Sequence, residues 1–337
     1  MSTSPRFRLG FFSYLQGKGT QAEIYEQSFE LFLAAEELGF DAGWVAQHHF
    51  GRLGGLPSPL VFFGALAART RHLMLGTAII SLPLEQPIRL AEDAAVFETL
   101  FPGRLQLGIG TGFATADVLA TFDKEGGDRR ALYDGSIDRF LRALHGETLN
   151  AESGVLYPAA GTLSARIWEA PSTLERVKES ASRGSGLLLS RVAIGAGSTP
   201  SDQVQIPMVD LYKASLPAGV SPQIGLSRTI YPSRDPDVAY RNIKAGLEAS
   251  AASRPELATM SIDEQIRHNN IHWGRPEDVV ESLKKEPLLG ESTDLICQVQ
   301  PGLPSFAETL EAIELIATEV APALGWRPAH QRSLARS

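Results

Sequence analysis

The sequence has one cysteine, no long apolar run and no excess of positive charge. Its cysteine, Cys297, has no partner for an internal disulfide, and the apolar segment DLICQVQ around it predicts a buried, unreactive thiol. No stretch reaches the roughly 18 apolar residues that a membrane-spanning helix needs. The formal net charge is -8, and no Lys/Arg-rich run occurs. Nucleic-acid binding is therefore not expected, because it depends on basic groups that release counterions.

The N-terminal segment MSTSPRFRLGFF lacks the apolar core of a signal peptide, so we expect a cytoplasmic protein. Of the 337 residues, 43% are hydrophobic, which is enough to build a large core. An α/β barrel commonly reaches this length as one domain. We therefore predict a single domain over residues 1–326, followed by a frayed C-terminal tail over residues 327–337.

Strand and helix patterns alternate along the whole chain. Short apolar runs predict strands at Arg6–Phe12, Ala42–Ala46, Leu73–Ser81, Arg104–Ile109, Arg166–Glu169, Leu187–Leu189, Gln223–Ile230 and Asp294–Val299. Amphipathic periodicity predicts helices at Ala22–Leu38, Leu60–Arg71, Gln86–Leu100, Asp128–His145, Ser172–Ser182, Pro236–Ala252, Pro276–Lys284 and Ser305–Val320. This alternation predicts a (β/α)8 TIM barrel. Two long loops, Phe50–Pro57 and Arg191–Ile206, are expected insertions at its carboxyl face, and the second has the composition of a lid.

The segment from Leu73 to Phe113 is the most informative part of the chain, because it reads as strand, helix, strand and glycine loop. Its helix is expected to bury a face made of Ile88, Ala91, Ala95, Val96 and Thr99. The glycine loop, Gly108 to Gly112, follows a strand end of the kind that binds ligands in α/β proteins. Two interpretations stay open: a tight turn without room for side chains, or a surface that lets a flat ligand approach the backbone.

Two adjacent histidines, His48 and His49, follow the second predicted strand. In extended chain neighbouring side chains point in opposite directions, so this pair is a poor chelator and no metal site is predicted. One imidazole at the barrel mouth suits proton transfer near neutral pH. Packing of both rings is the other interpretation of the same spacing.

The segment Glu169–Thr173 lies between a predicted strand and its helix. Ser172 is expected to cap that helix, with Glu175 completing a capping box. A helix start that carries hydroxyls also suits a phosphate group. Arg191 follows Ser190 at the end of another predicted strand, where its charge suits either a ligand anion or a surface salt bridge.

Taken together, these features resemble the bacterial luciferase-like, flavin-dependent monooxygenases, over nearly the whole chain. The most specific segment runs from Gly76 to Gly112. The resemblance is carried by the segments RLGFFSY, AGWVAQHHF, GLPSPL, LGTAIISLPLEQPIRLAEDAAVFETLFPGRLQLGIGTGF, EAPSTLERV, GRPEDVVESL and LICQVQPGLPSFAETLEAIELIATEVAPAL.

The resemblance implies a TIM barrel that dimerises and binds FMN across the carboxyl ends of its strands. It implies reduced FMN from a separate flavin reductase, dioxygen as co-substrate, and a small apolar or carbonyl-containing organic substrate, as in the alkanal monooxygenases. His48 matches the histidine that assists the oxygen chemistry, and a non-proline cis peptide is expected between Ala78 and Ile79. The residues expected to bind the cofactor are Ala78, Ile79, Gly110, Thr111, Gly112, Glu169, Ala170, Ser172, Thr173, Ser190 and Arg191.

Three residues depart from the family pattern. Gln47 stands where a glutamate often precedes the histidines, Thr111 replaces an arginine that holds the phosphate in luciferases, and Gln86 replaces a histidine. We hypothesise that Arg191 supplies the missing positive charge. Two alternatives stay open: an oxidoreductase that transfers hydride through a deazaflavin, and a non-catalytic flavin-binding or dimer-partner subunit.

Overall fold

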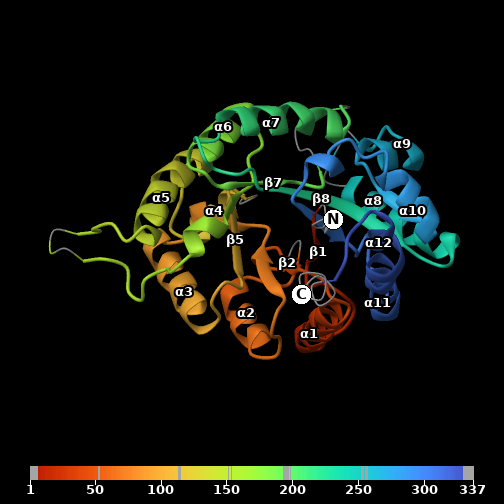
Figure 1. Ribbon diagram of the computed structural model, residues 1–337, viewed down its shortest axis with the longest axis horizontal. Helices are drawn as coiled ribbons and strands as arrows, with labels where there is room; N and C mark the ends of the chain where they lie inside the picture. The colour runs from red at the N-terminus through yellow and green to blue at the C-terminus, as the bar shows by residue number, and fades with distance from the viewer. Residues whose placement is uncertain are drawn as a thin grey trace. The chain divides into compact units, whose positions relative to one another are not determined.

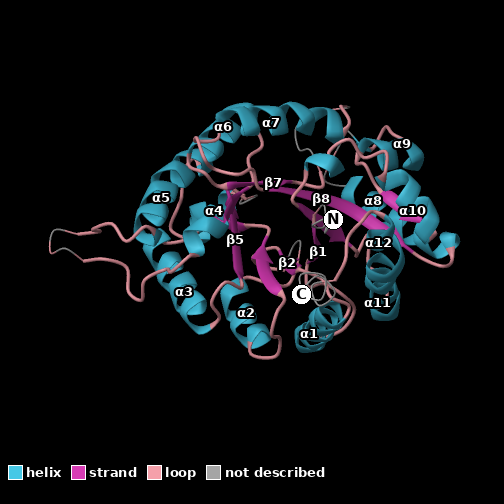
Figure 2. Cartoon of the chain, viewed as in Figure 1, coloured by secondary structure: helices cyan, strands magenta, loops and turns pink. Residues whose placement is uncertain are grey.

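The computed structural model describes residues 7–328 except 52, 53, 113, 114, 151, 153, 193–196, 198, 252, 253, 255 and 256. Strands and helices alternate along the chain, as Figures 1 and 2 show. The strands are β1 Arg8–Ser13, β2 Ala42–Val45, β3 Met74–Thr77, β4 Ile80–Ser81, β5 Leu105–Gly110, β6 Ile167–Glu169, β7 Gly186–Leu189, β8 Ile224–Pro232, β9 His272–Gly274 and β10 Asp294–Gln298.

The helices are α1 Gln21–Glu37, α2 Pro59–Ala67, α3 Pro87–Leu100, α4 Ala116–Thr121, α5 Arg129–Leu144, α6 Leu174–Ser182, α7 Ser201–Ser215, α8 Pro236–Ala251, α9 Ile262–His268, α10 Pro276–Leu283, α11 Phe306–Leu315 and α12 Ala321–Ala323. Short 3-10 turns cover Leu82–Leu84, Leu163–Arg166 and Leu289–Glu291, and a π-helical stretch covers Ile316–Val320. Within the described residues, no helix has the length and apolarity to cross a membrane.

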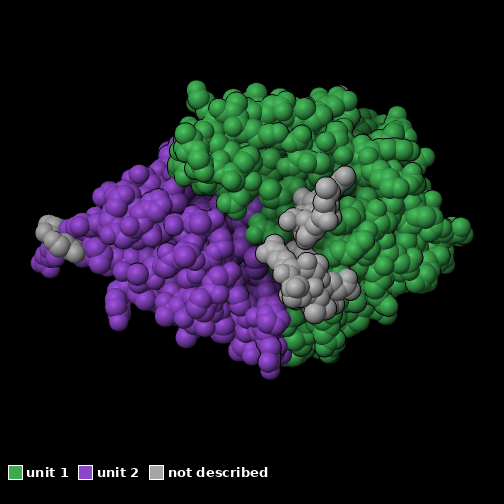
Figure 3. Space-filling model, in the orientation of Figure 1, with its two compact units in different colours: residues 1–44, 171–337 green, residues 45–170 purple. Residues whose placement is uncertain are grey.

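The chain divides into two compact units, coloured separately in Figure 3. Unit 2 runs from Val45 to Ala170 and contains β3 to β6 with α2 to α5. Unit 1 contains the chain before and after it, and so holds β1, β7 to β10, α1 and α6 to α12. The prediction of one domain over residues 1–326 stays a prediction, and residues 329–337 of the expected tail lie outside the described residues.

In unit 2, β5 is the central strand, with parallel partners on both sides. Leu75 of β3 lies opposite Leu105, and Ile109 lies opposite both Ile80 of β4 and Glu169 of β6. All six residues of β5 are buried, as expected for a parallel strand covered on both faces. Their side chains cannot reach solvent until the strand ends.

In unit 1, β8 pairs in parallel with β7, β9 and β10, and β10 also pairs with β1. Cys297 of β10 lies opposite Phe11 and Arg228 in these pairings. Its side chain is fully buried, and burial raises the pKa of the thiol. The prediction of a buried thiol in a strand is confirmed.

The alternation of parallel strands with helices confirms the predicted (β/α)8 TIM-barrel class. Among the ten strands of the described residues, two are additions to the eight principal ones: β4 continues β3 along β5, and β9 pairs with the end of β8. The expected strand Leu73–Ser81 is interrupted because Ala78 and Ile79 separate β3 from β4. These two residues are joined by a cis peptide bond, as the resemblance implied.

Several predicted elements are corrected by the structure. The segment expected to be a lid is partly helical, because Ser201–Ile206 begins α7; residues 193–196 and 198 lie outside the described residues. Helix α7 was not predicted, because it contains Pro207. Its buried residues nevertheless have helical spacing; they include Gln205, Met208, Val209 and Tyr212. Sequence reasoning also missed α4, α9 and β9, which are short and follow loop-like segments.

The predicted buried face of α3 is wrong in part. Val96 and Thr99 are exposed, whereas Leu90, Ala91, Ala94, Ala95, Phe97 and Glu98 are buried. Glu98 turns inward because its carboxylate pairs with the guanidinium of Arg166 and accepts a 3.1 Å hydrogen bond from the Gly103 amide. A buried charge pair therefore rotates the helix relative to the face that apolar spacing alone indicates.

Candidate functional site

The carboxyl ends of the unit 2 strands form a partly exposed surface of small and apolar groups. Ala78, Ile79 and Ala170 are half-buried, although the strands that lead to them are buried. A Cβ added to Gly110 would lie 3.3 Å from Cδ1 of Ile79 and 3.7 Å from Cβ of Ala170. The structure therefore brings four of the predicted cofactor-binding residues together.

The glycine loop after β5 is held by side chains on two sides. Gly112 has a φ of +62°, and a Cβ there would collide with the Ser81 side chain. The Ser81 hydroxyl donates to the Thr111 carbonyl at 3.3 Å, and Arg129 at the start of α5 donates to the Gly112 carbonyl at 2.6 Å. Gly112 is thus required by the tight turn, and the Cβ of any other residue at Gly110 would press against the Ile79 side chain.

Gln47 ties the cis-peptide segment to the end of β2. Its amide oxygen accepts from the Ser81 backbone N–H at 2.8 Å, and its amide nitrogen donates to the Glu85 carboxylate at 2.6 Å and to the Pro57 carbonyl at 3.2 Å. Its backbone N–H donates to the Ile79 carbonyl at 3.3 Å. Sequence reasoning noted Gln47 as a departure from the family but missed that it positions Ile79.

His48 and His49 are both half-buried but lie in different surroundings. The His49 ring makes an edge contact with Phe122, with 4.7 Å between ring centroids. Burial lowers the pKa of both imidazoles, and His49 lowers that of His48 further. The lowered pKa favours the neutral form of both rings near pH 7. No group of three His, Cys, Asp or Glu side chains in the described ranges could hold a metal ion.

Glu169 ends β6 with its side chain turned toward α5. The side chain is buried, and its carboxylate accepts a 2.6 Å hydrogen bond from the hydroxyl of buried Tyr133. The Glu169 carboxylate, which was predicted to contact the cofactor, is held by this tyrosine. No signal in the sequence pairs these two residues, which are 36 positions apart.

The remaining predicted cofactor-binding residues belong to unit 1. Thr173, not Ser172, caps α6: its hydroxyl oxygen accepts from the Arg176 backbone N–H at 3.4 Å. The predicted Ser172 cap and its capping box with Glu175 are therefore wrong. Starting the helix one residue later places Arg176, which has no carboxylate, at the third helical position, and leaves the Ser172 side chain exposed.

Ser190 and Arg191 follow β7 directly. The Arg191 guanidinium lies 5.5 Å from the Tyr14 ring centroid and donates to the Tyr14 hydroxyl at 2.8 Å. This contact with an aromatic ring takes the place of the surface salt bridge that was one expectation for Arg191. The Ser190 carbonyl accepts a 2.6 Å hydrogen bond from the Gln205 amide, which sequence reasoning did not include.

Each unit carries groups of a kind that a flavin cofactor uses. A tricyclic ring needs an apolar surface, and the half-buried side chains of Ala78, Ile79 and Ala170 in unit 2 are apolar. A phosphate needs hydroxyl, backbone N–H and cationic donors, of the kind found at Thr173 and Arg191.

The family model described as luciferase-like monooxygenase matches residues 8–286. The chain belongs to the luciferase-like monooxygenase family. Among curated relatives, it is 33% identical over 120 residues to the alkanal monooxygenase alpha chain of Photorhabdus laumondii, which is 36% of this chain and 33% of the relative. It is 36% identical over 93 residues to the oxygenase component of flavin-dependent trigonelline monooxygenase from Acinetobacter baylyi, which is 28% of this chain and 26% of the relative.

The chain also spans only part of the length of three further curated relatives, from Sinorhizobium fredii and Bacillus subtilis. The matched share of these relatives lies between 32% and 55%. Among solved structures, monooxygenase RslO1 from Streptomyces bottropensis has a TM-score of 0.77 at 25% identity, covering 94% of this chain and 99% of that one.

Two further solved structures share the fold but differ in cofactor. The oxygenating constituent of 3,6-diketocamphane monooxygenase from Pseudomonas putida, in complex with FMN, has a TM-score of 0.75 at 15% identity, covering 94% of this chain and 98% of that one. The coenzyme F420 dependent tetrahydromethanopterin reductase from Methanopyrus kandleri has a TM-score of 0.67 at 16% identity, covering 96% and 100%. The family resemblance read from the sequence is confirmed. FMN and F420 enzymes both have this fold, so the fold does not distinguish between the two cofactors.

Proposed function

We propose that this chain is the oxygenase component of a two-component flavin system. It would take reduced FMN from a separate reductase and oxidise a small apolar or carbonyl-containing organic molecule with dioxygen. The observation that carries the proposal is the half-buried apolar surface of Ala78, Ile79 and Ala170 around Gly110. Bound reduced flavin supplies two electrons, so that one oxygen atom enters the substrate and the other leaves as water.

The protein's part in this reaction is placement and proton transfer. We propose that Ala78, Ile79, Gly110, Thr111, Gly112 and Ala170 hold the ring, and that Glu169, Ser172, Thr173, Ser190 and Arg191 serve the polar chain and phosphate. Gln47 supports the ring site because it fixes Ile79 and Ser81 through its amide. His48 is the proposed proton acceptor, because a half-buried imidazole with a lowered pKa is neutral at physiological pH.

A binding and oxygen-consumption experiment tests the proposal. The protein is titrated anaerobically with reduced FMN and, in parallel, with reduced F420, while tryptophan fluorescence is followed. We expect tighter binding of FMN and substrate-dependent uptake of dioxygen. Tighter binding of F420, with hydride transfer in the absence of oxygen, would replace the proposal with the deazaflavin alternative. The fold shared with an F420-dependent enzyme is the reason for including this cofactor in the test.

Flavin binding without oxygen uptake over a broad panel of aldehydes and ketones would favour the third candidate, a non-catalytic subunit. Thr111 is the reason for considering this candidate, because it replaces the arginine that holds the phosphate in luciferases. Restoring a cation with Thr111→Arg would then strengthen flavin binding without starting turnover.

We also infer that the chain forms a homodimer through α2 and α3. The solvent side of α2 is apolar, with Val61, Ala65 and the C-cap residue Ala68 exposed at helical spacing, and Val61 is 75% exposed. On α3, Val96 and Leu100 are exposed as well. Apolar residues gathered on two helices in this way are typical of a protein interface.

A further inference from the structure

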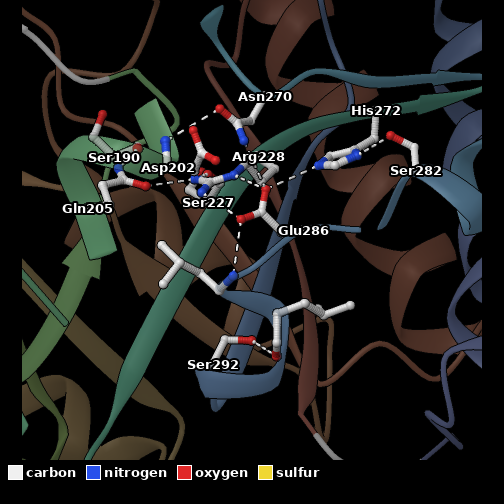
Figure 4. Close-up of polar contacts among 12 residues, drawn as sticks. Ser190, Asp202, Gln205, Ser227, Arg228, Asn270, His272, Ser282, Glu286 and Ser292 are labelled. Carbon is white, nitrogen blue, oxygen red and sulfur yellow. Dashed lines mark hydrogen bonds and ion pairs between the residues drawn. The ribbon is translucent and has the colours of Figure 1, made fainter. Parts of the chain in front are cut away.

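A buried ion pair in unit 1 belongs to none of the proposed flavin-binding residues. The side chains of Arg228 on β8 and Glu286 after α10 are both fully buried. Arg228 donates to the two carboxylate oxygens of Glu286, from Nε at 2.9 Å and from Nη2 at 3.1 Å (Figure 4). Replacing such a pair by apolar residues is often neutral or stabilising, so a gain in stability does not by itself account for its presence.

The third arm of the guanidinium points to Gln205 on α7. Arg228 Nη1 donates to Oε1 of Gln205 at 3.0 Å, and Nε2 of Gln205 donates to the Ser190 carbonyl at 2.6 Å. Figure 4 shows Gln205 between the guanidinium and Ser190. A guanidinium can only donate, so it requires the amide oxygen on its own side and thereby aims the amide N–H groups at Ser190. The charge pair thus sets which way the Gln205 amide faces.

We propose that Gln205 is a positioning residue for Arg191, acting through the Ser190 carbonyl and oriented by the Arg228–Glu286 pair. The hydrogen bond from Gln205 fixes the backbone at the end of β7, and Arg191 leaves that backbone at the next residue. Its guanidinium then stays on Tyr14, where the proposed function uses it to bind the flavin phosphate. This inference rests on the proposed function for the role of Arg191, but the fixing of Ser190 by Gln205 can be tested without flavin.

The decisive variant is Gln205→Glu. Beside Arg228 the new carboxylate stays ionised, so it keeps an acceptor for the guanidinium but has no N–H for Ser190. The matched control is Gln203→Glu, the same chemical change at an exposed position two residues away on α7. Gln205→Met removes both hydrogen bonds without adding charge and serves as the second variant if the first folds poorly.

Hydrogen exchange on the flavin-free protein measures the backbone effect. The Val192 amide donates to the Ser190 hydroxyl oxygen at 3.3 Å and is a local reporter. We expect amide exchange over residues 190–192 to be about tenfold faster in Gln205→Glu and Gln205→Met than in wild type. In Gln203→Glu the exchange rate should equal that of wild type. Unchanged exchange in both Gln205 variants would overturn the inference, whether or not the protein binds flavin.

A double-mutant cycle on FMN affinity then tests the route through Arg191. We expect Gln205→Glu and Arg191→Ala each to weaken binding about tenfold, and the double variant to bind no more weakly than Arg191→Ala alone. Losses that multiply would mean that Gln205 acts by general destabilisation, and the positioning role would be rejected. Wild-type protein that fails to bind FMN would instead reject the proposed function, while the exchange result would still decide whether Gln205 fixes Ser190.

Discussion

At the scale of single residues, the two neighbouring histidines have different expected roles. Turnover should fall by about 100-fold in His48→Ala, because a general base contributes an effect of this size, while FMN affinity is retained. His49→Gln is the control, since His49 packs against Phe122 and is not expected to move protons. Turnover and flavin titration on the same preparations separate chemistry from binding. Equal losses in the two variants would contradict the assignment of His48.

The pH dependence of turnover follows from the same residue. Burial and the neighbouring His49 lower the pKa of His48 from its ordinary 6.5, so the neutral base persists below that pH. We expect turnover to stay constant from pH 8 to 6.5 and to fall only in more acidic solution. The residual turnover of His48→Ala should lack this acidic limb. A limb that persists in His48→Ala would assign the titration to another group.

The Gln47–Glu85 contact gives a prediction on stability. Gln47→Glu would place two carboxylates at a 2.6 Å contact now made by an amide donor. Burial already raises the pKa of Glu85, and a second carboxylate would raise it further. A pKa that is higher in the folded state means stability lost as pH rises, so we expect about 2 kcal/mol of destabilisation at pH 8 that recovers toward pH 4.5.

Urea unfolding at the two pH values measures this effect. The control is the exchanged pair, Gln47→Glu with Glu85→Gln, which restores one donor and one acceptor and should recover most of the loss. A Gln47→Glu variant as stable as wild type at pH 8 would show that the amide is not needed to hold the segment around Ile79.

Residues that act through distant partners were the hardest to predict from the sequence. Family resemblance predicted Ala78, Ile79, Gly110 and Ala170 as one group, and each of them lies at or directly after the end of a strand. Gln205 could not be found in this way, since its partners Ser190 and Arg228 lie 15 and 23 positions away. Their pairing depends on which strand lies beside which helix, and that information is in the fold rather than in any short pattern.

At the scale of secondary structure elements, the buried pair between Arg166 and Glu98 joins α3 to the 3-10 turn that precedes β6. Their side chains are 14% and 6% exposed. Removing one partner leaves a buried charge, so Arg166→Ala should lower the free energy of unfolding by about 3 kcal/mol. Arg142→Ala is the matched control, because the Arg142–Glu147 pair is exposed and should contribute nothing measurable. Equal effects in denaturant unfolding would contradict the role given to Glu98.

Elements with strong apolar runs were predicted to within one or two residues, whereas those shaped by tertiary contacts were not. β5 and α1 follow directly from their patterns and caps. α7 did not, because Pro207 interrupts a pattern whose buried side includes the polar residue Gln205. The misassigned face of α3 has the same origin, since Glu98 is buried only because Arg166 reaches it.

At the scale of the whole molecule, alternation of elements was sufficient to predict the barrel class, since strands and helices of this length and order have few other arrangements. Substrate and oligomeric state do not follow from this alternation, because they depend on loops and on exposed faces. The exposed faces nevertheless make a specific expectation possible, since α2 and α3 carry the exposed apolar residues Val61, Val96 and Leu100.

The dimer proposal leads to the last prediction. Val61→Asp should leave the monomer folded, because the side chain is 75% exposed, but should place a charge in the proposed interface and convert the dimer to monomer. Val155→Asp is the control, as Val155 is 55% exposed in the same unit but lies outside α2 and α3. Light scattering after size-exclusion chromatography gives the mass, and circular dichroism verifies folding. A Val61→Asp protein that remains dimeric would move the interface to another face of the molecule, because a buried and unpaired carboxylate costs too much for a dimer to retain it.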